Sequence, residues 1–128
     1  MTNKTLLYRC WFEYKMYSVK SIDFNNKSVN LVGADVIAFQ EGILMQFIGE
    51  YDNSVERKPI FEGDIVKCSD LIGVIEYGKG KFYIDWYNKD KRTWRSDIDI
   101  WLDLGNLVVI GNVYENFELL PKEEKRGD

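Results

Sequence analysis

The chain has 128 residues, of which 45% are hydrophobic and 15% aromatic, and its formal net charge is −4. A chain of this length can bury a core without disulfides or a structural metal. The acidic balance argues against a general electrostatic attraction to nucleic acid, although it is compatible with a local basic patch. No apolar run reaches the roughly 18 residues that a membrane-spanning helix needs, and the N-terminal residues lack the pattern of a signal peptide. We therefore expect a soluble, cytoplasmic protein.

The residue types that most often carry catalysis are scarce. The chain contains no histidine, which removes the commonest general base and metal ligand and excludes Ser–His and Cys–His nucleophile systems. Cys10 and Cys68 match no metal-binding or redox spacing. We interpret both as buried free thiols in a reducing compartment. These observations predict a protein that is not an enzyme and that holds no cofactor and no metal.

Along the N-terminal half, short apolar and aromatic runs between clusters of Asn, Asp and Gly predict an all-β or β-dominated fold. The alternating run "LLYRCWF" predicts the first strand. "MYSVKSIDF" and "SVNLV" flank "NNK" and predict a hairpin in which Asn25 or Asn26 is left-handed. "ADVIAFQ" and "ILMQFIG" flank Glu41 and Gly42 and predict a second turn, at which Gly42 tolerates a positive φ.

The polar stretch "EYDNSVERK" then predicts an exposed loop, and we expect a subdomain boundary near residues 50–58. Beyond it we expect four strands, at residues 64–68, 72–77, 82–87 and 107–114. "GKGK" predicts a hairpin turn, and the nearly continuous apolar run "LVVIGNVY" predicts a central strand covered on both faces. Residues 121–128 are charged and predict a frayed tail after a single domain that spans residues 1–120.

The segment "SDIDIWLDLGN" carries two competing patterns. Its alternation of apolar residues with Asp is typical of a strand. Ser96 and Asp99, however, form an S-x-x-D capping pattern, and Gly105 suits the end of a helix. We expect at most a short helix near residues 96–104. The strands as a whole are compatible with a compact small barrel of the SH3-like type or with two packed antiparallel sheets.

Glu62 and Asp64, in "FEGDIV", pose the main question about chemistry. Residues two apart on an extended chain point the same way, so the two carboxylates can face one another at roughly 6–7 Å. Such a pair suits a general acid and base, or two ligands of a hard cation, and Asp97 and Asp99 form a similar pair. In the alternative that we favour, Gly63 supplies an unusual backbone angle and Asp64 bonds neighbouring N–H groups where a strand begins.

A basic and aromatic segment, "GKGKFYIDWYNKDKRTWR" at residues 78–95, is the candidate binding surface. On a small β-barrel its cations would follow phosphates while its exposed tyrosines stack on bases. Alternation places Ile84 and Trp86 on the core face and leaves Asp85, which weakens this interpretation, on the face of the tyrosines. The candidate residues are Lys79, Lys81, Tyr83, Tyr87, Lys89, Lys91, Arg92 and Arg95.

Three blocks of the sequence are those of a known family. They are "YRCWFEYKMYSVKSIDF", "LMQFIGEYDNSVERKPIFEGDIV" and "VVIGNVYENFELL", and through them the chain resembles the YopX family over about residues 8–120. The chain departs from that family at Phe117, where Pro is usual, and in the loop at residues 50–58, which lacks the Gly of a D-x-x-G turn. The motif residues, which we expect to be structural, are Gln46, Gly49, Glu62, Gly63, Asp64, Gly111, Asn112, Tyr114, Glu115 and Asn116.

The resemblance implies a mostly β fold and an origin in a phage or prophage of a bacterial host, but it implies no activity and no catalytic residues. Our first hypothesis is a phage accessory protein that acts as a non-catalytic interaction module. It would bind a host or phage protein, or assemble into a homo-oligomer, through aromatic anchors. The alternative is a small β-barrel that binds single-stranded or double-stranded nucleic acid through residues 78–95.

Overall fold

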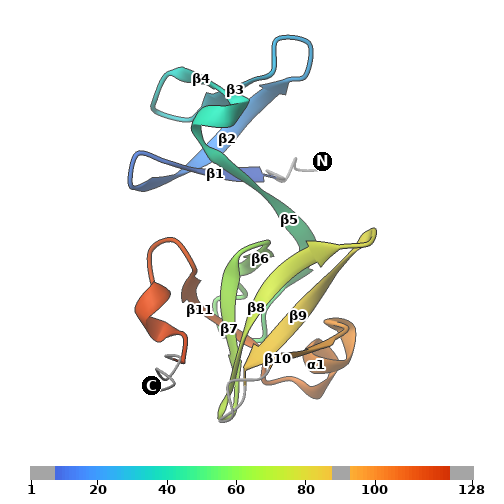
Figure 1. Ribbon diagram of the computed structural model, residues 1–128. Coiled ribbons are helices and arrows are strands. Elements are labelled where there is room, and N and C mark those ends of the chain that lie inside the picture. Colours follow the sequence, from blue (N-terminus) through green and yellow to red (C-terminus); the bar gives the residue numbers. More distant parts are fainter. Residues whose placement is uncertain (1–7, 88–92, 122–128) are drawn as a thin grey trace, which may run out of the picture. The chain divides into compact units, whose positions relative to one another are not determined.

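The computed structural model describes residues 8–87 and 93–121 (Figure 1). The chain divides into two compact units, Met1–Ile48 and Gly49–Asp128. The predicted β-dominated fold is confirmed, since strands are the main regular elements in the described part of both units. In the part of the chain that is described, the strands form two antiparallel sheets and do not close into a barrel.

The first unit is built from hairpins around one small core. Its elements are β1 (Tyr8–Phe12), β2 (Lys15–Asp23), β3 (Ser28–Leu31), β4 (Val36–Ala38), the 3-10 helix η1 (Phe39–Glu41) and β5 (Ile43–Tyr51), whose last residues belong to the second unit. These strands belong to a six-stranded sheet with the order β4-β3-β2-β1-β5-β6, in which β6 (Pro59–Phe61) comes from the second unit. Its buried core consists of Cys10, Val19, Val29, Leu31 and Ile37.

The second unit carries a five-stranded sheet with a short helix. Its elements are β6 (Pro59–Phe61), β7 (Asp64–Cys68), β8 (Leu71–Gly78), β9 (Lys81–Tyr87), β10 (Thr93–Ser96), α1 (Asp99–Leu104), β11 (Val108–Asn112) and the 3-10 helix η2 (Phe117–Leu119). The sheet has the order β10-β9-β8-β7-β11. The fully buried residues of this unit include Ile60, Ile65, Val66, Ile84, Trp86 and Leu107.

Two local predictions in the first unit are wrong. In the β2–β3 turn the left-handed residue is Lys27, with φ of 54°, because Asp23 Oδ1 accepts the N–H groups of both Asn25 and Asn26 at 3.0 Å and holds them in the turn. Gly42 is extended, with φ of −136°. It is needed for space instead, since a Cβ there would lie 2.7 Å from Cys10 Sγ.

Predictions for the second unit fared unevenly. The strands at residues 64–68, 72–77 and 82–87, the "GKGK" turn and the short helix are confirmed. The last strand is not central: β11 lies at an edge of its sheet and pairs only with β7. The stretch that was expected to be an exposed loop begins inside β5 and contains Asp52, which is fully buried.

The prediction that Cys10 and Cys68 are buried free thiols is confirmed. Among the described helices, none has the length and apolar character to cross a membrane. The predicted tail lies outside the described residues from residue 122 onward.

Candidate functional site

The Glu62–Asp64 pair sits in a turn that the backbone itself holds. Gly63 has φ of 90°; its N–H donates to the Ile75 carbonyl at 2.8 Å, and its carbonyl accepts the Val113 N–H at 3.0 Å. Asp64 is buried, and its Oδ2 accepts the Phe61 N–H at 2.8 Å. Glu62 is half-buried. These contacts favour the structural interpretation of the motif, in which a glycine turn and a buried carboxylate connect β6 to β7.

The closing motif "GNVYEN" forms a second turn of this kind. Asn112 Oδ1 accepts the N–H groups of Tyr114 and Glu115 at 3.0 and 2.9 Å, and Asn112 Nδ2 donates to Glu115 Oε1 at 2.9 Å. Asn116 Oδ1 accepts the Asn112 N–H at 3.1 Å. Gly111 is required because a Cβ there would lie 2.5 Å from the Asn116 side chain. The side chains of Asn112, Glu115 and Asn116 therefore hold this turn together.

The other two motif residues lie on β5. Gln46 is exposed opposite Tyr8 of β1 in the strand register. Gly49 has φ of 92°, a conformation that favours glycine.

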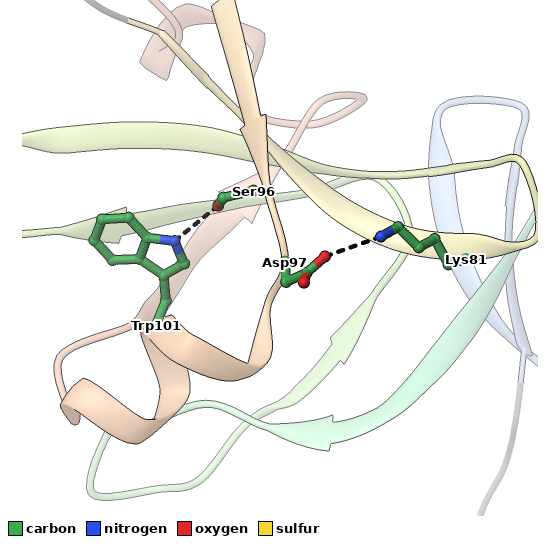
Figure 2. Close-up of polar contacts among 4 residues, drawn as sticks. All are labelled: Lys81, Ser96, Asp97 and Trp101. Carbon is green, nitrogen blue, oxygen red and sulfur yellow. Dashed lines mark hydrogen bonds and ion pairs between the residues drawn. The ribbon is translucent and has the colours of Figure 1, made fainter.

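The acidic residues do not gather into a metal site. Within residues 8–87 and 93–121, no group of three or more acidic or cysteine side chains is placed to hold a metal ion. Asp97 Oδ1 instead accepts a hydrogen bond from Lys81 Nζ at 3.0 Å (Figure 2). Asp99 is exposed in the first turn of α1.

Among the cations of the basic segment, the structure describes Lys79, Lys81 and Arg95, and the last two lie beside acids. Lys79 is exposed in the β8–β9 turn, and Lys81 forms the ion pair with Asp97 just described. Tyr87 is half-buried. Lys89, Lys91 and Arg92 lie outside the described residues.

Tyr83 lies on the face of β9 that alternation predicts, but that face is covered. Only 9% of Tyr83 is exposed, and the Arg95 guanidinium sits 4.2 Å from the centre of its ring. Arg95 Nε also lies 3.6 Å from Asp85 Oδ1. This arrangement leaves Tyr83 without a free face for stacking on a base.

Beside Tyr83, Glu76 has a raised pKa. Burial raises the pKa of this carboxyl first, and the Asp85 and Glu62 carboxylates raise it further, against the opposing effect of Arg95. Burial also raises the pKa of Tyr87, and so do Glu76 and Asp85. The face is thus acidic around a single described guanidinium, which disfavours an anionic ligand.

Sequence reasoning missed the surface that the short helix forms with β10. The Trp86 and Trp101 indole N–H groups both donate to Ser96 Oγ, at 2.9 and 2.7 Å (Figure 2 shows the bond from Trp101). The ring centres of Trp86 and Trp101 are 4.8 Å apart, and Trp94 packs 6.3 Å from Trp101. Ser96 therefore anchors two indoles instead of capping the helix, whose N-cap is Ile98.

Outside this buried anchor, apolar side chains reach solvent. The exposed fraction is 41% for Trp94, 57% for Ile100 and 61% for Leu104. At about 100° of rotation per residue, Ile100, Trp101 and Leu104 share one sector of the helix, and Asp99 and Asp103 occupy the sector beside it. We call the set Trp94, Asp99, Ile100, Trp101, Asp103 and Leu104 the α1 surface.

The signal for this surface was present in the sequence. Once "DIWLDL" is taken as a helix, its apolar residues cover more of the circumference than a single core-facing stripe can bury. The strand alternative, in which these residues alternate cleanly, concealed that excess.

The comparisons with known proteins identify a family. A family model described as YopX protein matches residues 3–121, which agrees with the resemblance seen in the three sequence blocks. No curated protein matches the chain.

Proposed function

We propose a binding role for this chain, which belongs to the YopX family: it contacts another protein through the α1 surface and catalyses no reaction. The observation that carries this proposal is the exposure of Ile100 and Leu104 on one sector of α1, together with that of Trp94, whose ring packs on Trp101 of the same helix. Exposed apolar side chains that occur singly need no explanation, but a contiguous group with a tryptophan is typical of an interaction site.

The rigidity of the surface supports the same role. Trp94 and Trp101 pack on Trp86, which is fully buried, and the Ser96 hydroxyl fixes two of the three indoles. Aromatic anchors that are already held in place lose little conformational freedom when a partner binds. Tryptophan is also among the residues that contribute most to binding energy at protein interfaces.

The charges beside the apolar sector indicate the kind of partner. Asp99 and Asp103 are both exposed and adjoin Ile100 and Leu104. A partner segment that combines apolar residues with Lys or Arg is therefore complementary to this surface. In keeping with the family resemblance, we propose that the chain is a phage or prophage accessory protein and that this partner is a host or phage protein in the bacterial cytoplasm.

Crosslinking from the surface tests the proposal. A photo-crosslinking residue replaces Leu104, and in a matched variant it replaces Tyr14, which is 92% exposed and belongs to the first unit. After irradiation in a nuclease-treated lysate of the host bacterium, we expect a discrete protein adduct from position 104 that position 14 does not give.

The adduct should also disappear when Asp103→Lys is added and persist when Asp70→Lys, an exposed acid in the β7–β8 turn, is added. Identical adducts from both positions, or none, would contradict the proposal. Adducts that depend on omission of the nuclease would favour nucleic acid as the ligand.

A further inference from the structure

On three of the four edge strands in the two sheets, a backbone N–H group donates a hydrogen bond to a carboxylate. On β4, the Ala38 N–H donates to Glu41 Oε1 at 2.8 Å. On β6, the Phe61 N–H donates to Asp64 Oδ2 at 2.8 Å. Edge strands with free N–H groups invite pairing with other chains, and these carboxylates block it.

The edge at β11 is covered most completely. The Val109 N–H donates to Asp52 Oδ2 at 2.8 Å, and the Val109 carbonyl accepts from Lys58 Nζ at 3.3 Å. Two residues earlier, Leu107 exchanges hydrogen bonds with Asn53 at 2.9 and 2.8 Å. The loop that starts at Asp52 thus occupies the position of a neighbouring strand.

The backbone groups at the edge of β10 follow from the register. Lys79 and Gly80, with φ of 51° and 82°, make a two-residue turn between Gly78 and Lys81, so that pair is hydrogen-bonded. Hydrogen-bonded and non-hydrogen-bonded pairs alternate along a strand pair. The backbone N–H and C=O groups of the even-numbered residues of β9 therefore point toward β10. Their partners on β10 are Trp94 and Ser96. The N–H and C=O groups of Thr93 and Arg95 therefore point away from the sheet.

In the described chain, no side chain is hydrogen-bonded to the backbone of Thr93 or Arg95, and β10 pairs only with β9. The same strand carries the exposed Trp94 of the α1 surface. Among the described residues, β10 is thus the edge strand on which no carboxylate caps an outward N–H group, and it also carries an exposed tryptophan.

We propose that β10 receives an extended segment of the partner protein as an added antiparallel strand. This inference rests on the proposed function and specifies how the partner binds. Alternate side chains of the added strand would pack beside Trp94. The N-terminal end of an antiparallel segment would lie beside the exposed Asp99, which follows β10, and near Asp97, whose carboxylate already accepts from Lys81. The segment therefore carries Lys or Arg at that end and apolar residues after it.

A synthetic probe tests strand addition directly. The probe is a short acetylated and amidated peptide with two lysines followed by alternating valine and threonine. In an NMR titration of the full chain, we expect the amide signals of Thr93 and Arg95 to shift. A twin peptide, N-methylated at alternate amides so that it cannot pair, should bind at least about tenfold more weakly. A second twin, with glutamates in place of the lysines, should also bind more weakly.

Matched protein variants locate the pairing. Thr93→Pro removes an outward N–H from β10 and should therefore abolish binding of the probe. The variant should still fold, because proline is tolerated on an edge strand. Val36→Pro is the control. Val36 is the neighbour of Ile37, which forms a hydrogen-bonded pair with Val29, so the backbone N–H of Val36 points outward from β4. On the same strand, Glu41 caps the N–H of Ala38. This variant should bind the probe like the parent protein.

Equal binding of the parent and N-methylated peptides would overturn strand addition while leaving the α1 surface as a side-chain docking site. Absence of binding by every peptide would overturn it as well. Sedimentation without peptide separates a further case. If the protein is a dimer that Thr93→Pro dissociates, a second copy occupies the edge and our choice of partner is wrong. Failure of the crosslinking experiment at position 104 would instead contradict the proposed function itself.

Discussion

The two edges of the five-stranded sheet differ in how their polar groups are satisfied. At β11, Asp52 and Asn53 bond the outward backbone groups of Val109 and Leu107. At β10, the outward groups of Thr93 and Arg95 lack such partners in the described structure, and Trp94 beside them reaches solvent. The comparison shows that one edge is committed to the fold, and it is the reason why we propose the other edge as a binding site.

The largest effect is expected at the closed edge, from Asp52→Ala. Asp52 is fully buried and accepts four hydrogen bonds, from the Ser54 hydroxyl and from the N–H groups of Ser54, Lys58 and Val109. Its removal leaves four donors without their acceptor and a cavity at a fully buried position, and we expect the free energy of unfolding to fall by about 4 kcal/mol. Urea unfolding measures the loss. A loss below about 1 kcal/mol would show that the loop does not hold β11.

Ser96→Ala tests the anchor beneath the open edge. The substitution removes the hydroxyl that accepts from both Trp86 and Trp101, so two indole N–H groups lose their partner. We expect a destabilisation of about 2 kcal/mol, with a change in tryptophan fluorescence. Ser21→Ala, at an exposed serine of β2, is the control and should be neutral. If the two variants unfold alike, the anchor does not stabilise the α1 surface.

The pH dependence of the free energy of unfolding tests the role of Asp52 at the closed edge. Burial raises the pKa of this carboxyl, but the hydrogen bonds from Ser54, Val109 and Lys58 together lower it below its ordinary value. The unfolded chain therefore binds the proton more readily, so the stabilisation is present above the ordinary pKa of 3.8 and is lost as the pH falls through the lower, folded-state pKa. Unfolding measured from pH 6 downward should show a steeper loss for the wild type than for Asp52→Asn. Parallel curves would contradict this account.

The smallest effect, of opposite sign, belongs to Glu76 on the sheet face near β10. Burial, Asp85 and Glu62 raise the pKa of this carboxyl. Its ionised form is thus disfavoured in the fold, and its contribution to stability declines as the pH rises through the raised pKa. Glu76→Gln should therefore be relatively more stable than the wild type at pH 7 than at pH 4. Thermal unfolding at the two pH values checks this, and a reversed order would refute it.

Local patterns predicted the elements better than their neighbours. The "GKGK" turn, the strand that starts at Asp64 and the helix that ends at Gly105 each depend on a few adjacent residues, and all three are confirmed. The position of β11 at an edge depends on which strands pair across the sheet, and apolar content alone does not determine that. The polar residues around Asp52 predict an exposed loop. Its burial depends on a hydrogen bond from the Val109 N–H, and Val109 lies 57 residues away in the sequence.

The candidate site was harder to predict for the same reason. The basic segment placed its tyrosines on the expected face of β9, but the burial of Tyr83 depends on Arg95 from the next strand. The α1 surface depends on Trp86, Trp94 and Trp101 meeting from three elements. Sequence spacing indicates the face of a strand, whereas burial of that face is set by tertiary contacts.

Amide hydrogen exchange of the free protein tests the central claim most directly, because it compares the two edges in one experiment. Capped N–H groups exchange only when the structure opens, whereas outward N–H groups in contact with water exchange freely. We predict that the Val109 amide is protected at least about a hundredfold more than the Arg95 amide. Equal protection of Val109 and Arg95 would contradict the account, since it would show that β10 is as closed as β11.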